Sequence, residues 1–212
     1  ADEDWACEAR RYYFNIVGKY GAQVQALLKK AATLDIQTIC PLHGPILKEN
    51  LGYYIGKYMT WSSYEPEDDG VLVAYASIHG NTKKAAEKMK EILEAKGAKK
   101  VAITDLSRDD MAEAIEDAFR YDKLVLAAAS YDASVFPCME TFLNKLTNKN
   151  YQNRKIAIIE NGSWAPTAAR VMKSYVEKMK KITLCEKTVT IKSAMKDADV
   201  IAMEELADEL LA

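Results

Sequence analysis

A short run of hydroxyl, amide and glycine residues separates an apolar strand pattern from an amphipathic helix pattern. The run consists of Ser77, Ile78, His79, Gly80, Asn81 and Thr82. Its backbone N–H groups lie at the positive end of the helix that follows, and this position favours an anion. Neither the Gly-Lys-Ser/Thr ending of a nucleoside triphosphate loop nor the three spaced glycines of a dinucleotide fingerprint is present. The run therefore predicts a site for one terminal phosphate, as on a mononucleotide such as FMN.

A plainer interpretation of the same run is a strand-to-helix turn whose Ser and Thr only cap the helix. Three polar side chains exceed what one cap requires, which favours the phosphate site. His79 lies in the middle of the run, and His43 is the only other histidine of the chain. We therefore expect His79 to be a loop side chain near the ligand and not a metal ligand.

Two further loops carry polar and aromatic residues suited to the flat ring of a flavin. Such a ring needs aromatic or apolar cover on its faces and backbone groups at its polar edge. We expect Tyr131 and Trp164 to stack on it, although loop aromatics also cover domain or oligomer surfaces. Asp132 either lowers the potential of a nearby flavin or is a solvated turn residue. The candidate binding residues in these loops are Ser130, Tyr131, Asp132 and Ala133 in one, and Asn161, Gly162, Ser163 and Trp164 in the other.

Alternating strand and helix patterns from residue 70 onward must position these loops. They predict an α/β fold with a doubly wound, five-stranded parallel sheet in the order 2-1-3-4-5. In this order the loops after strands one, three and four meet at the carboxyl edge of the sheet. The expected strands are Val71–Ala76, Val101–Thr104, Lys123–Ala129, Lys155–Glu160 and Thr188–Ile191, and helices after the first include Arg108–Arg120, Pro137–Leu146, Ala165–Lys180 and Asp199–Leu211.

The first 69 residues do not follow this alternation. Their patterns predict helices and one short strand, which cannot easily bury a core of their own. The polar and acidic stretch Trp61–Gly70 then indicates a boundary, so we divide the chain into residues 1–69 and 70–212. The expected elements of the first part are helices Trp5–Val17, Gly21–Thr33 and Leu51–Thr60 and the strand Asp35–Cys40.

Composition excludes several classes of function. The formal net charge is −2 with mixed signs, which argues against binding to nucleic acid or to a membrane surface. The chain starts with acidic and polar residues and has no long apolar run, so we expect a cytoplasmic protein. The four cysteines form no CxxC pair. With two histidines and no set of nucleophile, base and orienting residue, hydrolysis is disfavoured.

The segments CPLHGPI, SIHGNT, SYDAS and NGSWAP together resemble the C-terminal portion of flavodiiron proteins. The resemblance implies a flavodoxin-like domain with FMN at residues 70–212, after a remnant of a metallo-β-lactamase-like diiron domain at 1–69. It also implies that His43 is an iron ligand in a complete parent protein that reduces O₂ or NO. Rubredoxin or a flavin reductase would then supply electrons, and a homodimer would bring the flavin of one subunit beside the iron of the other.

The sequence lacks most of the iron ligands that this family requires. The HxExD-type ligand run is absent, and one histidine cannot hold two irons. We therefore expect an FMN electron-transfer module without stoichiometric iron and leave enzymatic activity open. One alternative is a stand-alone flavodoxin-like NAD(P)H or quinone oxidoreductase. The other is a non-catalytic signalling domain, although Ala76 and Ser77 stand where a phosphoacceptor site needs paired acids.

Overall fold

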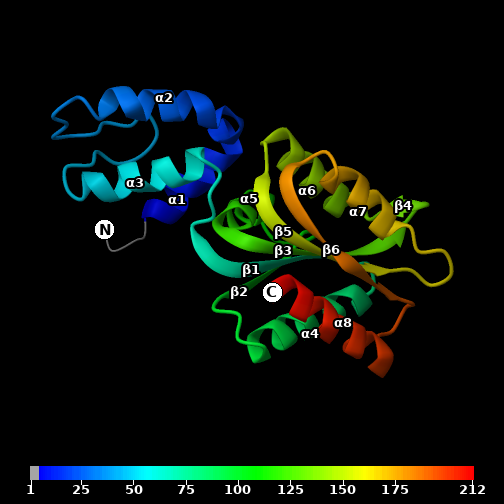
Figure 1. The fold of residues 1–212 in the computed structure, drawn as a ribbon. Coiled ribbons are helices and arrows are strands. Elements are labelled where there is room, and N and C mark those ends of the chain that lie inside the picture. Colours follow the sequence, from blue (N-terminus) through cyan, green and yellow to red (C-terminus); the bar gives the residue numbers. More distant parts are fainter. Residues whose placement is uncertain (1–4) are drawn as a thin grey trace.

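The central element of the structure, a computed structural model that describes residues 5–212, is a parallel β-sheet (Figure 1). Its five parallel strands lie in the order β2-β1-β3-β5-β6, and a short strand, β4, pairs antiparallel with β3. With β4 left out, this is the predicted order 2-1-3-4-5, so the predicted fold is confirmed. The strands are β1 (Asp68–Ala76), β2 (Val101–Asp105), β3 (Tyr121–Tyr131), β4 (Ser134–Val135), β5 (Gln152–Asn161) and β6 (Lys180–Ile191).

The central strands are apolar on both faces because helices cover both sides of the sheet. In β1, Leu72, Ala74 and Ala76 pack into one core, while Val71 and Val73 pack into the other. Successive side chains of a strand point to opposite faces, so a continuous apolar run marks a strand buried twice. This explains why the strand patterns after residue 70 are nearly unbroken.

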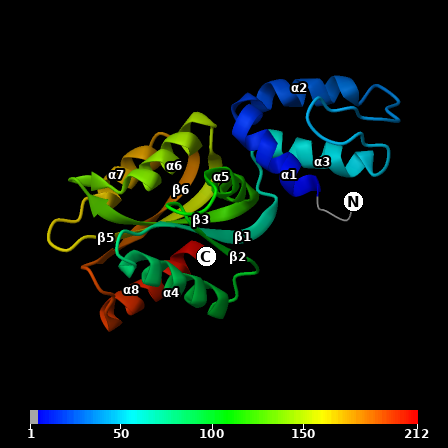
Figure 2. The same cartoon turned by 180° about the vertical axis from the view of Figure 1, so that it is seen from behind.

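Helices form a layer on each face of the sheet (Figures 1 and 2). Two helices, α4 and α8, cover one face, and α5, α6 and α7 cover the other. No helix of the described residues is long and apolar enough to cross a membrane. The helices of this part are α4 (Asn81–Ala95), α5 (Met111–Arg120), α6 (Pro137–Asn148), α7 (Ala168–Val176) and α8 (Asp197–Leu211).

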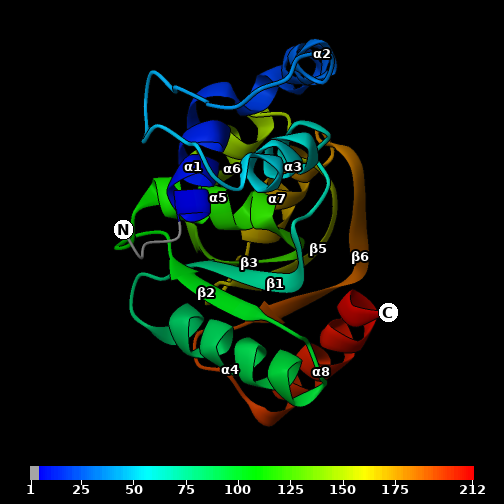
Figure 3. The same cartoon turned by 90° about the vertical axis from the view of Figure 1, so that its left-hand side faces the viewer.

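The N-terminal part forms a separate helical layer beside the sheet (Figure 3). The rings of Phe14 and Phe119 stack with centroids 4.1 Å apart and join this layer to α5. Its first four residues, which belong to the predicted segment 1–69, lie outside the described residues. The elements of this layer are α1 (Trp5–Tyr12), the π-helical turn η1 (Tyr13–Val17), the 3₁₀ turn η2 (Gly18–Tyr20), α2 (Gly21–Ala31) and α3 (Leu51–Ser62).

Three element predictions are wrong in detail. The expected strand Asp35–Cys40 is reduced to one antiparallel bridge between Ile39 and Leu47, because no sheet edge lies beside it. The expected helix Ala165–Lys180 ends at Val176, and β6 begins four residues later. Helix α3 continues two residues past the predicted end, through Trp61, which is buried.

Candidate functional site

A cavity of about 350 Å³ opens at the carboxyl edge of the sheet, among the loops after β1, β3 and β5. Of the fourteen predicted binding residues, all except Ser77 and Gly80 line it. The three loops thus meet as the strand order requires. Sequence reasoning missed four lining residues, namely Ala129, Ala165, Thr167 and Ser193.

Ser77 and Gly80 shape the first loop and do not line the cavity. The Gly80 N–H donates to Ser77 Oγ at 3.0 Å and closes a tight turn. Gly80 has a φ of 90°, in the left-handed region that favours glycine. A Cβ there would meet no atom within 4 Å, so the constraint on this residue is conformational and not steric crowding.

The N-terminus of α4 is open toward the cavity. Its N-cap residue is Gly80, and no side chain caps the helix. Among the described residues, the backbone N–H groups of Asn81, Thr82 and Lys83 have no hydrogen-bond partner. The hydroxyls of the run therefore do not serve as caps, and three donors at the positive end of a helix remain for an anion.

The N-terminus of α7, at the same edge of the sheet, is filled by side chains. Ser130 Oγ accepts hydrogen bonds from the N–H groups of Thr167 at 2.8 Å and Ala168 at 3.2 Å. The next N–H group, that of Ala169, donates to a carboxylate oxygen of Glu160 at 2.8 Å. Within residues 5–212, only the Arg170 N–H of this first turn has no hydrogen-bond partner, so this end offers one free donor where α4 offers three.

The loops after β3 and β5 form one wall of the cavity. The Thr167 hydroxyl donates to the Ser134 carbonyl at 2.7 Å, in addition to the bonds of Ser130. A Cβ on Gly162 would approach Pro166 Cα to 2.8 Å and Ser130 Oγ to 3.0 Å, so only glycine allows this close packing. Ser130 thus links the two loops, besides lining the cavity.

The predicted loop after the third strand is a tight hairpin. Tyr131 pairs with Ser134, and the two residues between them, Asp132 and Ala133, have φ values of 49° and 55°. Two left-handed residues in a row give the turn that suits twisted hairpins, but an alanine is strained there. The turn holds the half-exposed ring of Tyr131 at the cavity, edge-on to Phe136 at 5.6 Å.

Asn161 and Trp164 differ sharply in how they are held. The Asn161 side chain donates to the Ser193 carbonyl at 2.8 Å and accepts from the Ser193 N–H at 3.1 Å. It therefore ties the loop after β5 to the loop after β6. Trp164, at the tip of its loop, is 89% exposed. An indole this open has its apolar faces free to stack on a ligand.

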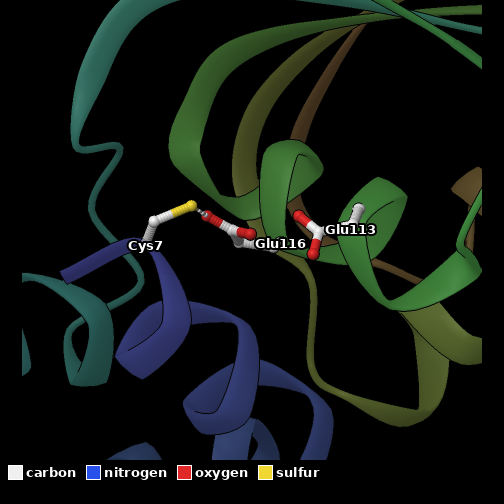
Figure 4. Close-up of side chains that lie close together, drawn as sticks. All are labelled: Cys7, Glu113 and Glu116. Atoms are coloured by element: carbon white, nitrogen blue, oxygen red, sulfur yellow. Dashed lines mark hydrogen bonds between the residues drawn. The ribbon is translucent and has the colours of Figure 1, made fainter. Parts of the chain in front are cut away.

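A second group of side chains lies between α1 and α5, and none of them lines the cavity (Figure 4). Cys7, Glu113 and Glu116 have ligand atoms within 4.8 Å of one another. Burial raises the pKa of the Cys7 thiol to about 11, and Arg10 already binds Glu116 with Nη2 at 2.5 Å from Oε1. Because the Glu116 carboxylate is already paired with Arg10 and accepts a hydrogen bond from the Cys7 thiol, we interpret this group as a structural contact between α1 and α5.

His43 lies in the N-terminal layer and is exposed. It borders a second, mostly apolar cavity of about 270 Å³, and its ring centroid is 5.3 Å from that of Tyr12. Among the described residues, His43 belongs to no group of three potential metal ligands. The structure therefore brings together the predicted flavin loops but leaves the predicted iron ligand without companions.

Comparison with known proteins points in the same direction as the geometry. A family model described as a flavodoxin domain matches residues 72–192. An uncharacterized protein of Methanocaldococcus jannaschii is 36% identical over 104 residues, which is 47% of this chain and 26% of that protein. The anaerobic nitric oxide reductase flavorubredoxin of Aeromonas hydrophila is 23% identical over 160 residues, which is 74% of this chain and 32% of that protein.

A solved structure shares the fold over almost the whole chain. The rubredoxin oxygen:oxidoreductase of Desulfovibrio gigas matches 97% of this chain and 52% of its own with a TM-score of 0.89 at 18% sequence identity. The N-terminal layer is included in this match. The chain thus spans about half the length of the Desulfovibrio protein and a smaller share of each of the other two relatives.

Proposed function

This chain belongs to the flavodoxin domain family, and we propose that it binds FMN in the cavity at the carboxyl edge of the sheet and relays electrons through it. The observation that carries the proposal is the pair of helix ends at this edge. Helix α4 presents three unpartnered N–H groups, whereas side chains already bind two of the first three N–H groups of α7. One open helix end suits a ligand with one phosphate at one end.

The residues present fit such a ligand. The N–H groups of Asn81, Thr82 and Lys83 would hold the phosphate, with Gly80 keeping the backbone of the turn accessible. Tyr131 and Trp164 would cover the ring, because both are exposed beside the cavity. When bound, FMN supplies a carrier that accepts one or two electrons.

The protein's own contribution is to bind, orient and partly shield the ring. The bonds from Ser130 and Thr167 fix the wall of the cavity before any ligand enters. A preformed wall lowers the entropic cost of binding and holds the ring in one orientation. Because Trp164 is 89% exposed, a ring stacked on it would lie near the protein surface, within reach of a redox partner.

We further propose that the relay serves a flavodiiron oxygen or nitric oxide reductase. The names of the Aeromonas and Desulfovibrio proteins support this, as does the match that extends over the N-terminal layer. In this proposal rubredoxin or a flavin reductase is the electron donor. His43 would ligate iron only together with residues that this chain does not contain, and a homodimer would bring flavin and iron together.

Equilibrium titrations with FMN, riboflavin and NADPH test the proposal. We expect one FMN per chain with a Kd at or below about 1 μM, and riboflavin binding at least about tenfold weaker, because riboflavin lacks the phosphate. NADPH should not displace FMN, because the loop Ser77–Thr82 lacks the spaced glycines that let a backbone approach a pyrophosphate. Equal affinities for FMN and riboflavin would contradict the phosphate site.

A further inference from the structure

Glu160, the penultimate residue of β5, is a buried carboxylate that sequence reasoning did not single out. It is 7% exposed, and each of its oxygens accepts a hydrogen bond. Oε2 accepts from the Ala169 N–H at 2.8 Å, and Oε1 accepts from the Thr190 hydroxyl at 2.8 Å. Among residues 5–212, no Lys or Arg nitrogen lies within salt-bridge distance of it. A buried charge without a cation is costly unless something else stabilises it.

The N-terminus of α7 supplies that stabilisation. The positive end of a helix stabilises a negative charge, especially one that accepts a hydrogen bond from a backbone N–H of the first turn. Together with Ser130, Glu160 engages the N–H groups of Thr167, Ala168 and Ala169. Helix α7 therefore carries its own anion, whereas α4 carries none.

The same hydrogen bond closes the base of the loop that carries Trp164. Glu160 precedes this loop in the sequence and Ala169 follows it, so the bond between them joins its two ends. The bond to Thr190 fixes that base to β6. The position of the Trp164 ring over the cavity thus depends on a side chain that does not line the cavity.

We propose that Glu160 is a positioning residue for the ring end of the mononucleotide site. It holds the Trp164 loop in place by joining the two ends of that loop and fixing them to β6. This inference rests on the proposed function, since it concerns the orientation of the ligand in that cavity. It predicts that Glu160 affects the binding of the ring and not the binding of the phosphate.

Titration of the full chain and its variants with oxidised FMN and with riboflavin tests this inference. Glu160→Ala should weaken both ligands by the same factor, about tenfold, because the loop loses a charge-assisted hydrogen bond while α4 is untouched. The quenching of Trp164 fluorescence by bound ligand, identified by comparison with Trp164→Phe, should fall in parallel. Glu160→Gln retains an acceptor for the Ala169 N–H and should restore both affinities to within about threefold of the original.

Two further variants complete the design. Glu140→Gln is the matched control, since this carboxylate on α6 accepts a hydrogen bond from the Tyr175 hydroxyl at 3.1 Å but caps no helix. It should leave both affinities unchanged. If Glu160→Ala fails to fold, Glu160→Asp replaces it: the side chain is one methylene shorter and cannot reach both partners, so a smaller but again equal loss is expected.

The outcomes separate this inference from the proposed function. If the unaltered chain binds no FMN, the proposed function fails. If it binds FMN but the Glu160 variants lose affinity for FMN alone, Glu160 acts at the phosphate and the inference is overturned. Unchanged affinities and unchanged Trp164 quenching in the folded variants would also overturn it.

Discussion

The N-terminal layer and the sheet domain differ in where they expose large apolar side chains. In the described part of residues 70–212, four such residues are exposed, and three of them, Ile78, Tyr131 and Trp164, line the cavity. The N-terminal layer exposes nine over a much shorter length: Tyr12, Ile16, Tyr20, Leu27, Leu34, Leu42, Ile46, Tyr53 and Met59.

The two parts share one core, because Phe14 and Trp61 belong to the same buried cluster as Leu72 and Phe119. They differ in where they leave apolar surface: the sheet domain leaves it mainly at the cavity, which is typical of a ligand site. Many large exposed apolar side chains on one thin helical layer favour a surface that packs against further protein. The comparison supports the proposal that the layer belongs with a metal-binding partner region, and the following experiments test it.

The largest effect on stability should come from the contact between the N-terminal layer and α5. Phe14→Ala removes a fully buried ring that stacks on Phe119, and we expect the free energy of unfolding to fall by about 3–5 kcal/mol. Limited proteolysis should then cut within residues 5–62 while FMN binding survives. Leu27→Ala, at a site 65% exposed, is the control and should cost less than about 0.5 kcal/mol. Loss of FMN binding in Phe14→Ala would show that the regions are not separable.

The ring side of the cavity should show the next largest effect. Trp164→Ala removes an exposed indole that has no packing role, so the free energy of unfolding should be unchanged. The affinities for FMN and riboflavin should each fall about tenfold, because a stacking contact of about 1 kcal/mol or more is lost. Titration calorimetry of both ligands provides the measurement. A marked loss of stability without loss of affinity would assign Trp164 to packing.

Acidification should weaken the packing of the N-terminal layer against the sheet domain, because Glu67 pairs with Arg10 of α1. Burial alone would raise the pKa of its carboxyl, but hydrogen bonds from Lys57, Trp61 and Arg10 outweigh burial and hold the pKa below the ordinary 4.5. Because the folded-state pKa is lowered, this stabilisation is present above pH 4.5 and is lost as the pH falls through the folded-state value. Denaturant unfolding from pH 7 to pH 3 should show a larger loss of stability in the unaltered chain than in Glu67→Gln. A parallel pH dependence in the two proteins would contradict the assignment.

The smallest effect concerns the hairpin at the cavity. Ala133→Gly removes a Cβ from a residue with a φ of 55°, and we expect a gain in stability of about 0.5–1 kcal/mol. Thermal unfolding measures the gain. FMN affinity should change less than twofold if the turn only holds Tyr131 in place. A loss of stability would mean that the turn is not strained.

The sequence predicted those features that depend on local pattern and topology. The turn between β1 and α4, the order of the parallel strands and the convergence of three loops follow from residues such as Gly80 and from the unbroken apolar run of β1. The hairpin of Asp132 and Ala133 was missed because its turn lacks the Asn-Gly or Asp-Gly signal. The early start of β6 was missed because the periodicity of the preceding helix was extended too far.

The roles of Glu160 and Thr167 could not be predicted from their types. Each depends on a partner from another strand or loop, and a glutamate at the end of a strand is otherwise unremarkable in a sequence. Likewise, the pattern Asp35–Cys40 has strand character, but whether it forms a strand depends on a neighbouring edge, which the sequence does not reveal. Local sequence patterns thus predicted where the cavity lies, whereas the hydrogen bonds that fix its walls depend on tertiary contacts.

Phosphorus NMR of bound FMN tests the central claim most directly. A free phosphomonoester titrates with a second pKa of about 6, whereas a phosphate held by the open N-terminus of α4 should stay doubly ionised to lower pH. The account predicts a single bound resonance whose chemical shift does not change between about pH 5 and 8. A resonance that titrates like that of free FMN would contradict it.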